Sequence, residues 1–242
     1  MLVRAALIAM LTVAACDTGH KPAQASRGSA ADPWDSPATG SAAPPPARPA
    51  RPLDMDGTIE GATPALLATP LPGYADAKVG DWRAFHHVTT GTLGNFHATA
   101  IAVVTAVTPT IVTIELKGRL DETGEQRSDG ADAIPRAFTV AHEIHHQHGD
   151  WTASHVELGD DPFTIDGRKF ACKKLAFASD DPMMPGKDTR VEVWLSPDVP
   201  AGGEVAVREV QKTSALTITM TSDLIGFGDA THTTWGTRPP GL

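Results

Sequence analysis

The stretch HATAIAVVTAVTPTIVTIEL, residues 97–116, decides the class of this fold. It contains two runs rich in β-branched residues, 97–107 and 110–116, which are separated by Thr108 and Pro109. β-branched side chains favour extended backbone, and a proline between two such runs favours a turn. The stretch therefore predicts a β-hairpin.

Alternation of apolar and polar residues continues on both sides of this hairpin. Upstream, Trp82 and Ala84 fall on one face of an expected strand, and Arg83 and Phe85 fall on the other. Downstream, the same period of two predicts strands at 163–165, 169–178, 190–195, 204–210 and 216–227.

The segments between these strands are polar. Residues 118–132 predict a long exposed loop, and the tail after residue 228 is expected to fray. Many short strands with little helical periodicity predict a mainly β fold. We expect a single curved antiparallel sheet or half-barrel with at most one or two short helices.

The N-terminus has the features of a bacterial lipoprotein signal. Arg4 supplies a positive charge, and residues 5–15 are an apolar run that is too short to span a bilayer as a helix. Small residues then lead into Cys16. Cys16 is therefore the expected lipidation site, where several acyl chains would hold the protein at a membrane. The alternative is an ordinary secretory peptide with an incidental cysteine.

The segment after Cys16 predicts a tether. It is rich in Pro, Ala, Ser and Gly, and it cannot bury enough apolar surface to fold. The expected organisation is a signal peptide at 1–15, a lipidated cysteine and tether at 16–53, a β-rich domain at 54–235 and a disordered tail at 236–242. The expected location is the bacterial cell envelope, on a membrane facing the periplasm or the exterior.

Charge and cysteine content exclude some functions. The net charge of -9 and the sequence pI of about 5.5 argue against a nucleic-acid partner. The chain has 2 cysteines, so lipidation of Cys16 would leave Cys172 without a partner for an internal disulfide.

The segment FTVAHEIHHQHGDWTASH, residues 138–155, carries the clearest chemical motif. His142, Glu143 and His146 match the HExxH pattern. On a helix, the two histidines would offer ligands to one zinc ion, and Glu143 would act as the base on the bound water. A zinc-dependent hydrolase is therefore one alternative, although its third ligand would fall on Thr152, which is not a usual zinc ligand.

The same segment also fits a strand. Thr139, Val140 and Ile144 suit extended backbone at least as well as a helix. In a strand, the histidines at 142, 146 and 148 share one face and could bind a metal without catalysis. The leading interpretation is a solvated, His-rich strand or loop, with no catalytic residue and no resident cofactor.

Three further segments carry a family resemblance. They are VGDW at 79–82, GRKFACKKL at 167–175 and VWLSPDVPAGG at 193–203. Together they resemble a group of uncharacterised bacterial envelope lipoproteins, broadly similar to half-barrel carriers of the lipoprotein-localisation type. Half-barrel relatives hold acyl chains in their concave face. The resemblance thus implies a membrane-anchored lipoprotein whose non-catalytic β domain binds an apolar ligand or an envelope protein partner.

Overall fold

The computed structural model describes residues 49–53, 55, 57–91, 94–148, 152–180, 188–213 and 216–242. The predicted signal peptide, Cys16 and most of the predicted tether lie outside these residues. Within the described ranges, none of the helices has both the length and the apolar character that crossing a membrane requires.

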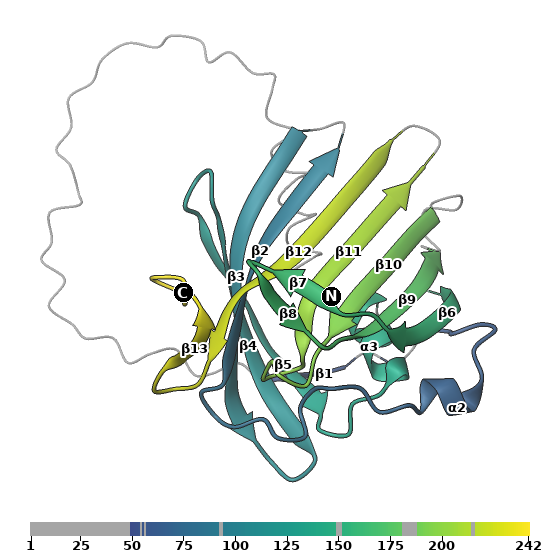
Figure 1. The fold of residues 1–242 in the computed structure, drawn as a ribbon, viewed down its shortest axis with the longest axis horizontal. Coiled ribbons are helices and arrows are strands. Elements are labelled where there is room, and N and C mark those ends of the chain that lie inside the picture. The colour runs from purple at the N-terminus through teal and green to yellow at the C-terminus, as the bar shows by residue number, and fades with distance from the viewer. Residues whose placement is uncertain are drawn as a thin grey trace, which may run out of the picture.

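One curved sheet forms the body of the described chain (Figure 1). Its strand order is β1-β5-β4-β3-β2-β12-β11-β10-β9-β6, and β13 pairs with β12 beside this path. Neighbouring strands are antiparallel except β1 and β5, which are parallel. Its strands are β1 (Arg51–Pro52), β2 (Trp82–Gly91), β3 (Gly94–Val107), β4 (Ile111–Leu120), β5 (Gln126–Pro135), β6 (Thr152–Asp160), β9 (Lys173–Asp180), β10 (Asp188–Leu195), β11 (Glu204–Lys212), β12 (Thr217–Gly228) and β13 (Thr233–Gly236).

The remaining elements are small. β7 (Phe163–Ile165) and β8 (Arg168–Phe170) form a separate hairpin, and the two helices of the described chain are α2 (Pro64–Leu67) and α3 (Val140–His148). The expected fold class, a mainly β protein with one or two short helices, is confirmed.

The hairpin predicted from residues 97–116 is confirmed by the pairing of β3 with β4. Two predicted loops are wrong. β4 and β5 extend through most of 118–132, and β13 lies within the tail that was expected to fray. In both places a neighbouring strand pairs with the backbone, and this pairing does not require apolar side chains.

The strand predicted at 169–178 is interrupted at Ala171 and Cys172. Before them β8 pairs with β7, and after them β9 joins the main sheet. The alternating pattern is similar in both pieces, so the pattern does not reveal that they belong to different sheets.

A single buried cluster joins the two ends of the sheet. Ile114 and Ile134 come from β4 and β5, whereas Leu175 and Val193 come from β9 and β10. Side chains so far apart in the strand order meet because the sheet curves around them. This concave surface, which we call the inner face, is also contacted by Phe138, Val140 and Ile144.

The opposite, outer face is covered by the small hairpin and by β13. The ring of Phe163 lies 5.0 Å from that of Trp194, and the ring of Phe170 lies 5.5 Å from that of Trp235. The Arg168 guanidinium also sits over the Trp235 ring, 5.8 Å from its centroid. Aromatic and cation–π contacts of this kind fix the hairpin on the sheet.

The segment that follows the predicted tether links the two edge strands. β1 pairs with β5, and the Arg51 guanidinium donates to Asp132 at 3.1 Å. A few residues later Ile59 forms a parallel bridge with Ala153 of β6, and Glu60 N–H donates to the Ala153 carbonyl at 2.7 Å. Figure 1 shows β1 beside β5, with the chain continuing past β6 to α2.

Candidate functional site

The HExxH segment is helical. Our expectation of a solvated strand or loop is wrong, because residues 140–148 form α3 and Glu143, His145 and His148 are buried. One local and one long-range hydrogen bond outweigh the β-branched residues at its start. Thr139 N–H donates to His142 Nδ1 at 3.2 Å, and Val140 N–H donates to the Thr69 carbonyl at 3.1 Å.

His142 has a structural role at the start of this helix. Its ring reaches back from the third helical position to Thr139, whose hydroxyl lies 2.9 Å from His142 Nδ1. In a capping box this backward contact is usually made by Glu or Gln. A histidine in this place is not part of the usual helix-start pattern, so the helix start is hard to recognise in the sequence.

The histidines of α3 point in different directions. The rings of His142 and His146 lie 5.7 and 6.3 Å from the ring of Phe138, whereas the His148 ring lies 5.5 Å from that of Phe177 on β9. The helical period separates His148 from the other two, although a strand would have put all three on one face.

The described residues contain no group of three or more His, Cys, Asp or Glu side chains that could hold a metal ion. Glu143, the base of the zinc alternative, accepts a hydrogen bond from Gln147 Nε2 at 2.6 Å and lies 4.0 Å from His146 Nδ1. The Glu143 carboxylate therefore interacts with the Gln147 and His146 side chains of its own helix. The zinc and metal-binding alternatives remain predictions that lack a third ligand.

A recess opens on the inner face beside α3. It contains about 690 Å³ of space free of protein atoms, part of it open to solvent, and about 70 Å³ is accessible to the centres of water molecules. One water needs roughly 10–15 Å³ on that measure, so this space holds about five to seven water molecules. The recess is lined by Tyr74, Arg83, Phe85, His87, Ala100, Ile101, Ala102, Ile114, Leu116, Asp132, Ile134, His146, Gln147 and Glu204.

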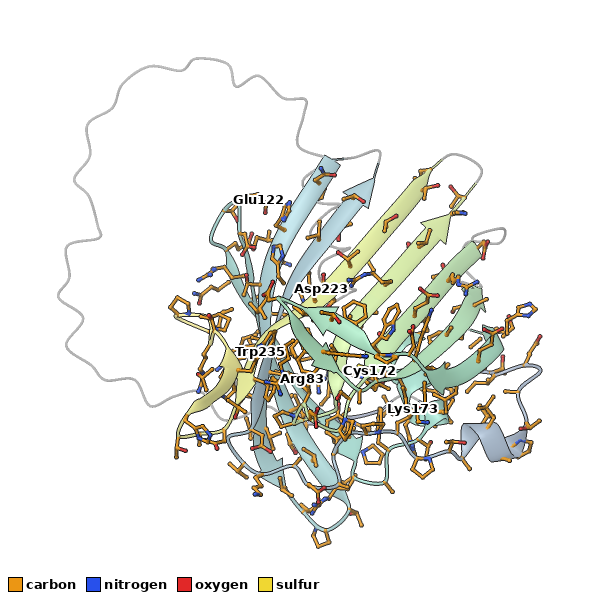
Figure 2. The ribbon with its side chains drawn as sticks, viewed as in Figure 1. Arg83, Glu122, Cys172, Lys173, Asp223 and Trp235 are labelled. Carbon is orange, nitrogen blue, oxygen red and sulfur yellow. The ribbon has the colours of Figure 1, made fainter. Side chains whose placement is uncertain are left out.

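The polar wall of the recess is built around Arg83. This side chain is only 4% exposed, and its Nη2 lies 3.8 Å from Glu204 Oε2 on β11. Its guanidinium carbon sits 5.6 Å from the centre of the Phe85 ring, on the same face of β2. Nε and Nη1 of Arg83 have no hydrogen-bond partner. Figure 2 shows Arg83 in the dense group of side chains at the base of the sheet.

Gly202 gives Arg83 and Tyr74 the space they need. Its φ is +115°, and a Cβ at this position would clash with Arg83 Nη1 and with the Tyr74 hydroxyl. The Gly202 N–H donates to the Gly73 carbonyl at 3.1 Å, which holds the two loops together over the guanidinium.

The charges in this wall stabilise one another. Burial raises the pKa of Glu143, but hydrogen bonds from His146 and Gln147 and the charge of Arg83 outweigh it, so the pKa is lowered overall. Burial alone would lower the pKa of Arg83, yet Tyr74 and Glu204 raise it overall. Arg83 is therefore a buried cation next to two carboxylates.

Sequence reasoning missed this wall. Two signals were present: Arg83 shares a strand face with Phe85, where a core side chain is expected, and Tyr74 is the only tyrosine of the chain. Neither signal could have linked them to Glu204, because that contact joins residues far apart in the chain.

Known structures show distant likenesses. A Bacteroides fragilis protein described as exported, with a YmcC-like fold, is 11% identical, matches with a TM-score of 0.42 and covers 67% of this chain and 100% of its own. A Parabacteroides distasonis protein described as a lipoprotein is 11% identical, with a TM-score of 0.39 over 66% of this chain and 99% of its own.

A DUF1329 family protein from Desulfovibrio piger is 8% identical, with a TM-score of 0.24 over 65% of this chain and 88% of its own. No family model and no curated protein sequence matches the chain.

The role of Gly202 can be tested by a pair of substitutions. Gly202→Ala should lower the free energy of unfolding by about 3–5 kcal/mol, because it adds backbone strain and a clash with Arg83. Gly124→Ala is the matched control, since Gly124 also has a positive φ but nothing lies within 4 Å of its Cβ position. Gly124→Ala should lower the free energy of unfolding by only about 1–2 kcal/mol. If both variants lose the same free energy of unfolding in urea denaturation, the close approach of Arg83 to Gly202 is contradicted.

The buried Glu143 carboxylate predicts a pH dependence. Because its folded pKa is lowered from the ordinary 4.5, its stabilising effect is complete above that pH and is lost as the pH falls through the folded value. Glu143→Gln should lower stability by about 3 kcal/mol at pH 7. It should also weaken the loss of stability as the pH falls below 4.5.

Denaturation at three pH values checks this, with the exposed Glu125→Gln as the control. The control should behave as the wild type at each pH. A Glu143→Gln variant with the wild-type pH profile would show that this carboxylate is not stabilised in the folded state.

Proposed function

We propose that this protein is a membrane-anchored lipoprotein of the bacterial cell envelope whose β domain binds an apolar ligand in the recess and catalyses no reaction. The observation that carries the proposal is the recess itself. Apolar residues of β3, β4 and β5, among them Ala102, Ile114 and Ile134, form one wall, and α3 closes one side. Apolar recesses with a few convergent polar groups are the usual form of small-ligand sites.

The size of the recess limits how the ligand is held. The accessible volume of about 70 Å³ lies well below the roughly 300–1,000 Å³ of sites that enclose a drug-sized molecule, so the recess has room for only part of such a ligand. We infer that one end of the ligand is enclosed beside Ala102, while the rest lies along the open part of the inner face.

The polar groups near the recess support binding rather than chemistry. Glu143 is held by Gln147, and the Arg83 cation, which is not a nucleophile, is paired with Glu204. Cys172 belongs to a different buried cluster, and burial raises the pKa of its thiol, which opposes formation of the reactive thiolate.

The anchoring part of the proposal rests on the sequence around Cys16. A chain expressed in a bacterial host with a labelled fatty acid should incorporate the label, and Cys16→Ser should abolish incorporation. Cys172→Ser is the control and should incorporate the label as the wild type does, because Cys172 is buried in the folded domain. If the Cys16→Ser protein still incorporates the labelled fatty acid, Cys16 is not the lipidation site.

Ligand binding can be tested by filling the recess. Ala102→Leu adds three carbons to a buried wall residue, so it should raise the free energy of unfolding by up to about 2 kcal/mol. It should also weaken binding of an uncharged apolar dye, N-phenyl-1-naphthylamine, by at least tenfold in a fluorescence titration.

Ala178→Leu is the control. Ala178 pairs with Arg190 on the outer face and does not line the recess, so dye affinity should not change. Equal affinity in wild type and Ala102→Leu would place the dye elsewhere, and an absence of dye binding by the wild type would contradict the proposed function.

A further inference from the structure

A second and larger cavity lies between three segments that begin or end strands. They are residues 71–77 before β2, residues 197–201 between β10 and β11, and residues 227–229 at the end of β12. About 420 Å³ of this cavity is accessible to the centres of water molecules, against about 70 Å³ in the recess. This volume falls within the roughly 300–1,000 Å³ of sites that hold a small ligand. We call this cavity the acidic groove.

The acidic groove combines apolar walls with carboxylates. Val199 and Phe227 line it with apolar atoms, although most of their surface is buried. Four other lining residues are aspartates: Asp76, Asp81, Asp198 and Asp229. Asp76 and Asp198 are exposed, so their carboxylates face solvent at the edge of the groove. An apolar centre with charged groups at its edge is the usual anatomy of a surface that binds another protein.

Cations of the described chain do not balance the charge of the acidic groove. None of the described residues that line it is Lys, Arg or His, and Asp76, Asp81 and Asp198 form no ion pair with a described residue. The Arg136 guanidinium donates to the Ala75 carbonyl and not to a carboxylate. The groove therefore presents an unbalanced negative charge to a partner.

Asp229 contributes to this charge over the whole physiological pH range. The Thr231 hydroxyl and the Thr231 N–H each donate to its carboxylate at 2.7 Å. These hydrogen bonds lower the pKa of Asp229 to about 2. The His232 ring, whose Nδ1 lies 2.9 Å from the same carboxylate, balances the charge only when the ring is protonated.

Backbone hydrogen bonds fix the walls of the acidic groove before any partner binds. The Gly202 N–H donates to the Gly73 carbonyl at 3.1 Å, which joins the first segment to the loop that contains the second. The Asp229 N–H donates to the His232 carbonyl at 3.0 Å, which closes the turn after β12. A surface that is already ordered loses less conformational entropy when it binds.

The placement of the carboxylates argues against a metal ion as the occupant. In the described part of the chain, no three His, Cys, Asp or Glu side chains could bind one metal ion together. An occupant with several positive charges separated by apolar groups fits better. Lys and Arg side chains have this form, because their aliphatic stems pack on apolar surface while their charged ends reach carboxylates.

We propose that the acidic groove binds a segment of a partner protein in which basic and apolar residues alternate. Its apolar side chains lie against Val199 and Phe227, and its basic side chains pair with the four aspartates. This inference does not rest on the proposed ligand of the recess, because the two cavities share no lining residue.

The test uses the full chain with Cys16→Ser, so that the protein carries no lipid. The probe is a fluorescein-labelled peptide in which three lysines alternate with two leucines, and fluorescence anisotropy measures its binding at pH 7.5 and low salt. The control peptide has glutamate in place of each lysine. It should bind about tenfold or more weakly, because its carboxylates meet those of the groove.

Variants of the protein link this binding to the acidic groove. Asp76→Asn and Asp198→Asn should each weaken binding of the lysine peptide by about threefold, as expected for the loss of one exposed ion pair. Ala75→Trp should weaken it by about tenfold or more, because it places a large side chain at an exposed lining position without changing the charge. Glu157→Gln, which removes an exposed charge on β6 outside the groove, is the control and should leave binding unchanged.

Thermal melting confirms that each variant is folded. If the lysine peptide does not bind, or binds no better than the glutamate peptide, the inference is wrong. If Glu157→Gln weakens binding as much as the groove variants, the peptide responds to net charge alone and the site is disproved. If spermidine displaces the peptide at an equal concentration, the groove holds a small amine and the protein partner is disproved. In each case the dye titration of the recess is unaffected.

Discussion

A buried cation holds the base of this domain together. Arg83 projects from β2 beneath the loop of Gly202, faces Glu204 of β11, and its charge lowers the pKa of Glu143 on α3. A charge taken out of water is costly, and removing one partner of such a pair typically costs about 3–5 kcal/mol. Strand, loop and helix are therefore fixed relative to one another, and this arrangement leaves the recess beside α3.

The curvature of the sheet brings strands from its two ends together. Because β3 to β5 and β9 to β11 meet around one cluster, their inward side chains form a single surface. That surface is apolar near α3 and becomes polar toward Thr189 and Ser179.

The segment after the predicted tether also packs against this sheet. It pairs with β5 through β1 and with β6 through Ile59, and Leu53 and Ile59 pack against the inner cluster. Asp132 both lines the recess and accepts the hydrogen bond from Arg51. The segment that follows the predicted tether thus lies next to the proposed site.

The sequence by itself determined the fold class, because alternation of side chains is a local property, and the hairpin of β3 and β4 follows from residues 97–116 alone. It could not determine that residues 140–148 are helical. Thr139 and Val140 favour a strand, and the helix depends on the His142 ring and the Thr69 carbonyl. It also could not place Arg83 beside Glu204. The Thr69–Val140 and Arg83–Glu204 contacts join segments that are distant in the chain, and only the tertiary structure brings such segments together. The His142–Thr139 contact is local, but it is not part of the usual helix-start pattern.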